Sequence, residues 1–246
     1  MNAKKIKKEL IRQKSSNFKG NIYYKTQISF AYNSNKIEGS KLTEDQTEAI
    51  FDTHSFIPKT NDLIKLDDLL EVKNHFKLFD YMLENIDNKL NKDMIIKMHS
   101  ILKRGTSDED NPLYNVGGFK KVPNIIGITK VIETSKPESV EKDLEDLLKD
   151  YLSLKEVNLK NIIDFHVRFE RIHPLSDGNG RIGRIIMFKE CLKNNIIPFI
   201  ILDSEKAYYM RGLKEYNKDR KYLIDTILHF QDIYEDLSNQ LLDYKI

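Results

Sequence analysis

The stretch from residue 172 to residue 184 reads IHPLSDGNGRIGR. It holds three of the chain's ten glycines together with a histidine, a carboxylate and two arginines. Upstream, apolar side chains recur every three or four residues from Ile162 to Ile172, which predicts a helix. Pro174 ends that helix, because proline disfavours helical geometry in the residue before it. Apolar residues from 182 to 192 then restart the helical period, so the stretch is predicted to be a loop between two helices.

The predicted loop has the features of a phosphate cradle. The first backbone N–H groups of a helix lack partners within the helix, and the helix dipole contributes about 0.3–1 kcal/mol to the binding of an anion there. Gly178 and Gly180 permit close approach of the backbone. Arg181 and Arg184 lie three residues apart and therefore project from nearly the same face of the second helix. Together these features predict a site for phosphate groups.

Two further residues add chemistry to this loop. Asp177 offers the hard oxygen ligand that Mg²⁺ prefers, and His173 can act as a general base. The glycine spacing also matches the dinucleotide-binding pattern G-x-G-x-x-G, but that pattern requires a preceding strand. A helix is predicted here instead, so the dinucleotide interpretation is rejected. A plain helix–helix turn does not require all these polar residues together.

Residues 173–184 resemble the signature of Fic proteins, HxFx(D/E)GNGRxxR, with Leu175 in place of the usual phenylalanine. The resemblance implies an all-α fold, a Fic-type helical bundle with a small β-hairpin flap. It implies transfer of AMP from ATP to a Ser, Thr or Tyr hydroxyl of a target protein, with Mg²⁺. By this resemblance His173 is the catalytic base and Asp177 the metal ligand. The ATP and phosphate ligands would be Gly178, Asn179, Gly180, Arg181 and Arg184, with Tyr209 and Asn217 lining the base pocket.

A second motif lies near the N-terminus. Residues 23–37 are predicted to be a helix that ends at Gly39, so Glu38 lies near the negative end of the helix dipole, where a carboxylate is disfavoured. Thr43, with Gln46 three residues later, marks the next helix start. Ser34-x-x-x-Glu38-Gly39 resembles the inhibitory motif (S/T)xxxE(G/N) of Fic proteins. The resemblance implies that Glu38 pairs with Arg184 and blocks the γ-phosphate.

The segment 105–137 breaks the helical pattern with glycines and prolines between β-branched residues, which predicts a short hairpin or extended loop. Gly118-Phe119-Lys120 resembles the start of the Fic flap. By that match the flap residues that contact the target are Asn124, Ile125, Ile126 and Gly127, with the target added as a strand.

Composition limits the class of protein. The formal net charge is +2, from 40 basic and 38 acidic residues, which argues against a nucleic-acid binder that relies on bulk charge. There is no apolar run long enough for a transmembrane helix and no apolar signal region, so no membrane partner is expected. The single cysteine, Cys191, fits a reducing cytoplasm and a packing role. His75, His99 and His229 are interpreted as core residues.

The chain length fits one domain with a small addition. We expect N-terminal helices with the inhibitory motif over residues 1–60, and a catalytic core with closing helices over 61–246. Further helices are predicted at residues 62–88, 92–102, 138–153, 161–172, 181–194, 204–216 and 221–242, after a helical lead-in at 1–18.

Several alternatives remain open at this level. The same site could remove AMP from a modified target or use another nucleotide donor, or the chain could act only by binding. A kinase-like branch usually carries lysine at the position of Gly180, so glycine there favours nucleotidyl transfer. Self-modification and a homodimer are further options, and the target protein is not indicated by the sequence.

Overall fold

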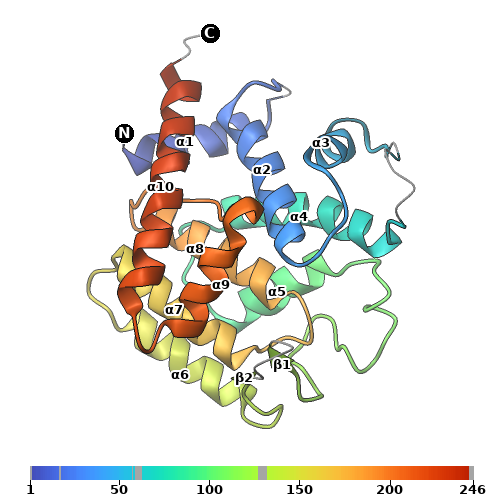
Figure 1. Cartoon of the computed structure of the whole chain (residues 1–246), viewed down its shortest axis with the longest axis vertical. Helices are drawn as coiled ribbons and strands as arrows, with labels where there is room; N and C mark the ends of the chain where they lie inside the picture. Colours follow the sequence, from blue (N-terminus) through green and yellow to red (C-terminus); the bar gives the residue numbers. More distant parts are fainter. Residues whose placement is uncertain (1, 17, 57, 59–62, 127–131, 244–246) are drawn as a thin grey trace.

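The computed structural model describes residues 2–16, 18–56, 58, 63–126 and 132–243. Its elements are, in order, α1 (Ala3–Gln13), α2 (Ile22–Ile37), α3 (Glu44–Thr53), α4 (Leu66–Glu84), α5 (Lys92–Leu102), β1 (Ile125–Ile126), β2 (Ile132–Glu133), α6 (Val140–Leu152), α7 (Leu159–Ile172), α8 (Asn179–Lys193), the 3-10 turn η1 (Asp203–Glu205), α9 (Lys206–Glu215) and α10 (Arg220–Asp243). Figure 1 shows the helices gathered around α8. The predicted all-α bundle is confirmed.

Several helices begin where short polar side chains cap them. The Oδ1 atom of Asn91 accepts from the N–H of Met94 at 2.8 Å at the start of α5. Thr43 and Gln46 form a reciprocal capping box at the start of α3, as their spacing predicts. Each such cap satisfies a backbone donor that the helix leaves free, which fixes where the helix begins.

The helix that carries the two arginines is the centre of the bundle. All residues of α8 are buried except Gly180 and Lys193. It contacts α1, α2, α4, α5 and α7. Because α8 has no solvent-facing side, its buried cations Arg181, Arg184 and Lys189 are paired with other groups of the protein. The start of α8, and with it the loop before it, is therefore held by the core of the protein.

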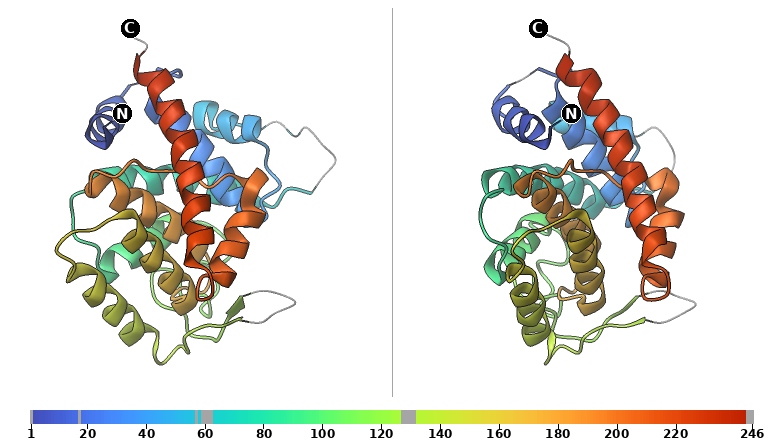
Figure 2. Two further views of the ribbon diagram at one scale, coloured as in Figure 1. Left: turned by 60° about the vertical axis from the view of Figure 1, so that its left-hand side comes forward. Right: turned by 90° about the vertical axis from the view of Figure 1, so that its left-hand side faces the viewer.

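The N-terminal helices share this core. Phe30 of α2 packs against Phe188 of α8 with ring centroids 5.3 Å apart. The hydroxyl groups of Thr26 in α2 and Tyr234 in α10 are hydrogen-bonded at 2.8 Å. Figure 2 shows α1 and α2 beside the C-terminal half of α10. The N-terminal helices thus pack as part of one bundle, and the predicted boundary at residue 60 stays a prediction.

A small antiparallel pair interrupts the helices. Ile125 pairs with Glu133, and Ile126 pairs with Ile132. The pair lies at the end of the molecule opposite the C-terminal end of α10 (Figure 2). Gly127 lies outside the described residues, and the role of this segment as a flap stays a prediction.

The sequence analysis predicted that Cys191 and three histidines pack in the core, and this is correct for all of them except His229. Cys191, His75 and His99 are buried, as predicted. His229 is not a core residue: its side chain is 54% exposed and lies 3.2 Å from the carboxylate of Glu205. The apolar period of α10 places this position on the solvent side. In the described ranges, no helix is both long and apolar enough to cross a membrane.

Candidate active site

The loop between α7 and α8 turns sharply at two positions with positive φ. His173 caps the C-terminus of α7 with φ 52°, and its N–H donates to the carbonyl of Phe169 at 2.9 Å. Gly178 precedes α8 with φ 82°. Glycine adopts this conformation without strain, whereas His173 adopts it at a cost, which is a common feature of functional positions.

The side chain of Asn179 braces this loop. Its Oδ1 accepts from the N–H of Leu175 at 2.9 Å, and its Nδ2 donates to the carbonyl of Leu175 at 2.8 Å. The Leu175 side chain is fully buried, so leucine fills this position of the loop. The amide of Asn179 is thus committed to the loop, and no side chain caps the start of α8. The first N–H groups of α8 remain for a ligand.

The imidazole of His173 is oriented for proton transfer. Its Nδ1 lies 3.2 Å from the carbonyl oxygen of Glu170. Because a carbonyl only accepts, Nδ1 carries the hydrogen and Nε2 keeps the free lone pair. Burial lowers the pKa of His173, and the charge of Lys120 lowers it further, against the carbonyl contact and the charge of Glu38. The imidazole is therefore neutral at neutral pH and can accept a proton.

A network of charges surrounds Asp177. Its Oδ2 is bound by the Nη2 of Arg181 at 3.0 Å and by the Nζ of Lys103. The other end of the Arg181 guanidinium binds Glu71 of α4. Burial alone would raise the pKa of Asp177, but Arg181 and Lys103 outweigh it and hold the pKa well below its usual value. Asp177 is thus ionised at neutral pH, and its side chain is 45% exposed.

The guanidinium of Arg184 is occupied by the end of α2. Its Nε donates to Ser34 Oγ at 3.0 Å, and its Nη2 donates to the carbonyl of Ser34 at 2.9 Å and to Glu38 Oε1 at 2.7 Å. The Arg184 side chain is 3% exposed and that of Glu38 is 33% exposed. The structure therefore brings the two predicted inhibitory residues onto the predicted arginine.

The turn after α2 explains why Glu38 can reach this position. The N–H of Ser40 donates to the carbonyl of Asn35 at 3.1 Å, and that of Gly39 to the carbonyl of Lys36 at 3.0 Å, which is the Schellman pattern. Gly39 has φ 99°, which requires glycine. A Cβ at Gly180 would lie 2.3 Å from Oε1 of Glu38. The carboxylate thus lies directly over the start of α8.

Behind Arg184 lies a buried polar group that the sequence analysis missed. Oε1 of Glu170 is buried without a hydrogen-bond partner. Burial, with the charge of Glu38, raises the pKa of Glu170 to about 8, while Arg184 opposes the shift. In the sequence, the only sign that Glu170 belongs to the site is its position three residues before His173.

The predicted base-pocket residues have different environments. The hydroxyl of Tyr209 is 2.6 Å from Nε2 of His166, and the Tyr209 side chain is 1% exposed. Asn217 is exposed, and its Oδ1 accepts from Nη1 of Arg171 at 2.8 Å. Their role in binding the base stays a prediction.

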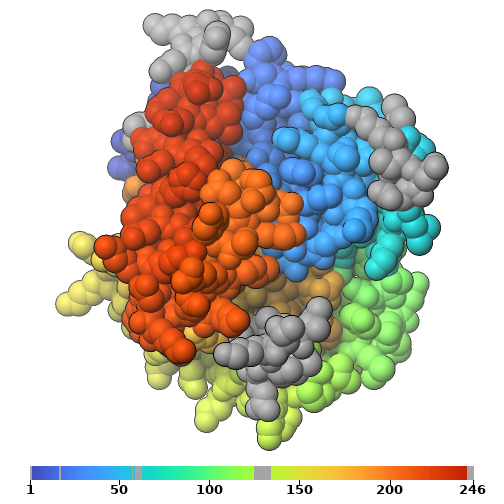
Figure 3. Space-filling model, viewed as in Figure 1, coloured from blue at the N-terminus to red at the C-terminus, as the bar shows by residue number. Residues whose placement is uncertain are grey.

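The flap segment is tied to the loop by its lysine. The N–H of Lys120 donates to the carbonyl of Pro174 at 2.9 Å, and its Nζ binds Asn124 Oδ1 at 2.6 Å and Thr134 Oγ1 at 2.7 Å. Nδ2 of Asn124 donates to the carbonyl of Leu175 at 3.1 Å. The start of the segment predicted to be a flap therefore lies against the α7–α8 loop. Figure 3 shows the pale-orange segment around the start of α8 set back between α9, the blue α2–α3 segment and the green segment after α5.

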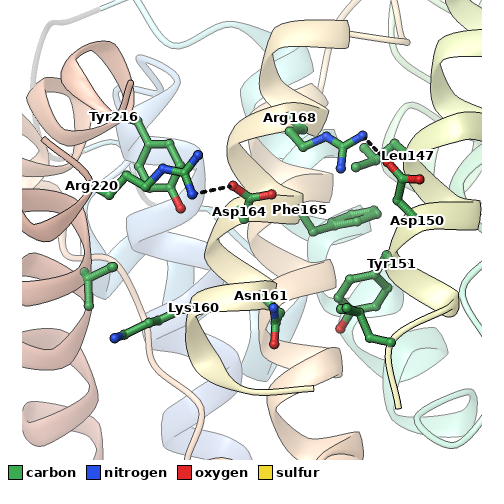
Figure 4. A pocket seen from close by; sticks show the side chains of 12 residues that line it. Leu147, Asp150, Tyr151, Lys160, Asn161, Asp164, Phe165, Arg168, Tyr216 and Arg220 are labelled. Atoms are coloured by element: carbon green, nitrogen blue, oxygen red, sulfur yellow. Dashed lines mark hydrogen bonds and ion pairs between the residues drawn. The ribbon is translucent and has the colours of Figure 1, made fainter. Parts of the chain in front are cut away.

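A separate cavity of about 350 Å³ lies on the other side of α7, against α6 and α10. Figure 4 shows Asp164 and Arg168 pointing to opposite sides of α7, toward Arg220 and Asp150. The Arg168–Asp150 pair spans 2.8 Å and the Arg220–Asp164 pair 4.0 Å. No residue of the 172–184 stretch lines this cavity, and these four charges pair with each other. The α7–α8 loop is therefore the better candidate for chemistry.

The chain resembles known proteins in the region that contains the α7–α8 loop. The sequence model of the Fic/DOC family matches residues 89–191. The chain has the same fold as a Fic domain containing signaling protein from Bacteroides thetaiotaomicron, with a TM-score of 0.75 at 19% identity over 98% of this chain and 95% of that one. Residues 89–191 of the chain thus match the Fic/DOC family.

Curated relatives add names at lower coverage. The chain is 26% identical over 190 residues to the "Protein adenylyltransferase Fic" of Nematostella vectensis, covering 76% of this chain and 42% of that protein. It is 24% identical over 193 residues to "Protein adenylyltransferase fic-1" of Caenorhabditis elegans, covering 76% of this chain and 36% of that protein. The chain thus spans about two fifths of the length of these relatives.

Proposed function

We propose that this chain transfers AMP from ATP to a hydroxyl side chain of a protein and that Glu38 holds it inactive. The names of its relatives support adenylyl transfer. The observation that carries the proposal is the arrangement at the start of α8. His173, Asp177, Arg181 and Arg184 lie at one helix N-terminus, and Glu38 pairs with Arg184.

His173 would act as the general base. The hydroxyl oxygen of the target would bond to the α-phosphorus while its proton passes to Nε2 of His173. The bond from the α-phosphorus to the bridging oxygen would break, and pyrophosphate would leave with the electron pair. The neutral imidazole and the donor contact at Nδ1 both support this role.

The phosphates would lie against the first turn of α8. The N–H groups of Asn179 and Gly180 would donate to phosphate oxygens, since no side chain caps the start of α8, and Gly178 would let the phosphates approach the backbone closely. Arg181 would supply fixed positive charge behind them. Asp177 fits Mg²⁺, because its carboxylate is ionised and part of it reaches the surface. Bound there, Mg²⁺ would neutralise phosphate charge.

Glu38 would compete with the nucleotide for Arg184. A γ-phosphate that reached Arg184 would meet the carboxylate of Glu38, 2.7 Å from the guanidinium, and like charges repel. Departure of Glu38 would leave the arginine free to hold that phosphate. Ser34 would steady the guanidinium in both states, because it contacts Nε and Nη2 on the helix side.

The target would bind along the flap. Asn124 lies beside the catalytic loop and β1 follows directly after it, so an extended target segment pairing there would bring its hydroxyl toward His173. Ile125 and Ile126 of β1 would flank that segment. Self-modification would use the same geometry, and a homodimer would let one copy present the hydroxyl to the other.

Labelled ATP tests the type of reaction. The Glu38→Gly variant is expected to attach label from [α-³²P]ATP to protein in a cell lysate and to add no label from [γ-³²P]ATP beyond that of the lysate alone. Label from the γ position alone would assign phosphoryl transfer instead. Absence of label from either ATP would contradict adenylyl transfer from ATP, and labelled UTP would then test the donor.

The acid limb of the pH–rate profile should report the pKa of His173. We expect kcat/KM of Glu38→Gly to stay high down to a pH below 6.5, because burial lowers the pKa of His173 and removal of the Glu38 charge lowers it further. Initial rates of labelling from pH 5 to 8 measure the limb. An acid limb at or above 6.5 would mean that another group controls proton transfer.

A further inference from the structure

The carboxylate of Asp177 belongs to a cluster that the family signature does not include. Glu71 of α4 and Asp108 of the segment after α5 each place an oxygen atom within 4.8 Å of the others and of an Asp177 oxygen. Such a set of hard oxygen atoms is what a divalent cation binds. In this chain the Nζ of Lys103 is paired with all three carboxylates instead.

The burial of these groups is graded. The side chain of Lys103 is 2% exposed, those of Glu71 and Asp108 are 13% and 18% exposed, and that of Asp177 is 45% exposed. The ammonium therefore lies at the inner end of the cluster, and Asp177 lies at the outer end, toward the phosphate cradle. The cation that holds the cluster together is thus part of the chain.

The contacts also divide the two oxygen atoms of Asp177. Lys103 and Arg181 both bind Oδ2. The side-chain cations thus fix one oxygen and leave Oδ1 to other ligands. A carboxylate held in this way keeps a defined orientation, which a metal ligand needs.

The net charge of the cluster determines how strongly it attracts a divalent cation. Three carboxylates, Lys103 and Arg181 sum to one net negative charge. One residual charge attracts a divalent cation weakly, whereas a cation that arrives with a polyphosphate also has the phosphate oxygens as ligands. Removing the ammonium would leave two net negative charges around the same oxygen atoms.

We propose that Lys103 is the positioning residue of Asp177: its ammonium fixes Oδ2 and takes the place of a resident divalent cation, so that metal joins Asp177 only together with a nucleotide. The inference rests on the proposed function for the role of Asp177 as the nucleotide's metal ligand. By this inference, Lys103, Glu71 and Asp108 determine when a metal ion binds at Asp177.

Mn²⁺ binding without nucleotide tests the assignment. Lys103→Met is expected to bind Mn²⁺ at least about tenfold more tightly than the wild-type chain, measured as loss of the free-ion electron paramagnetic resonance signal, because it gains one unit of uncompensated negative charge. Lys103→Arg, which restores the charge, is expected to bind Mn²⁺ as weakly as the wild type. Lys103→Gln, which keeps a hydrogen-bond donor, replaces Lys103→Met if circular dichroism shows that the methionine variant does not fold.

Lys92 provides a matched control. Its Nζ also joins two carboxylates, those of Glu141 and Glu145, on the exposed faces of α5 and α6. Lys92→Met should leave Mn²⁺ binding unchanged. A folded Lys103→Met or Lys103→Gln chain that binds Mn²⁺ no more tightly than the wild type would overturn the proposal, as would a folded Lys103→Arg chain that binds Mn²⁺ as tightly as Lys103→Met. Neither result depends on AMP transfer, so a failure of the proposed reaction is seen separately in the labelling of Glu38→Gly.

Discussion

Replacing His173 by alanine in the Glu38→Gly background is expected to slow AMP transfer by about 10²–10⁴-fold, the usual contribution of a general base. The reason is local. Nδ1 of His173 is held by the carbonyl of Glu170 at 3.2 Å, so the ring presents Nε2 as the acceptor for the proton of the target hydroxyl. Initial rates of protein labelling from [α-³²P]ATP measure the effect.

A histidine outside the site provides the control. His229 is 54% exposed on α10, and His229→Ala in the same background should keep the rate of Glu38→Gly. ATP binding should persist in the His173 variant, because no phosphate ligand is removed. A His173→Ala chain that labels its target at the rate of the Glu38→Gly parent would remove His173 from the chemistry.

Replacing Arg181 by leucine is expected to lower the free energy of unfolding by about 3 kcal/mol, the low end for breaking a buried ion pair. The Arg181 side chain is 3% exposed and joins Glu71 to Asp177, so its loss leaves two carboxylates short of one cation. Lys103 still pairs with both, which is why the low end applies. Urea unfolding followed by circular dichroism gives the value.

Arg12 is the matched control for this stability measurement. Its guanidinium pairs with Glu9 on the surface of α1, and Arg12→Leu should leave the midpoint of urea unfolding unchanged. Equal midpoints for the Arg181 variant and the wild type would mean that the ion pairs around Arg181 contribute nothing net. The ion pairs would then only orient the Asp177 carboxylate.

The sequence predicts the loop and its neighbours well because the relevant signals are local. Pro174 and the glycines mark the ends of α7 and α8, and the apolar period marks the helices. The partner of Glu38 could also be predicted, but only by resemblance, since Arg184 lies 146 residues away. The misplaced carboxylate at a helix end indicated that a partner was needed.

What the sequence could not predict depends on segments that meet only in the folded chain. Glu71, Lys103 and Asp108 look like ordinary surface residues of a charged chain, and no spacing rule links them to Asp177. The use of Asn179 as a loop brace was likewise hidden, because it depends on how Leu175 packs. Charged side chains near a helix end are common, so burial had to be seen before their role could be argued.

The central claim is that the contact between Glu38 and Arg184 keeps the site inactive. A hydrogen bond between charged groups contributes about 1.5–3 kcal/mol, which corresponds to about a ten- to hundredfold change in the population of free Arg184. The most direct measurement is the ratio of initial rates of protein labelling from [α-³²P]ATP, Glu38→Gly over wild type, at equal protein concentration. We predict a ratio of about ten to one hundred from that free energy. Equal rates, with both chains labelling protein, would contradict inhibition by Glu38.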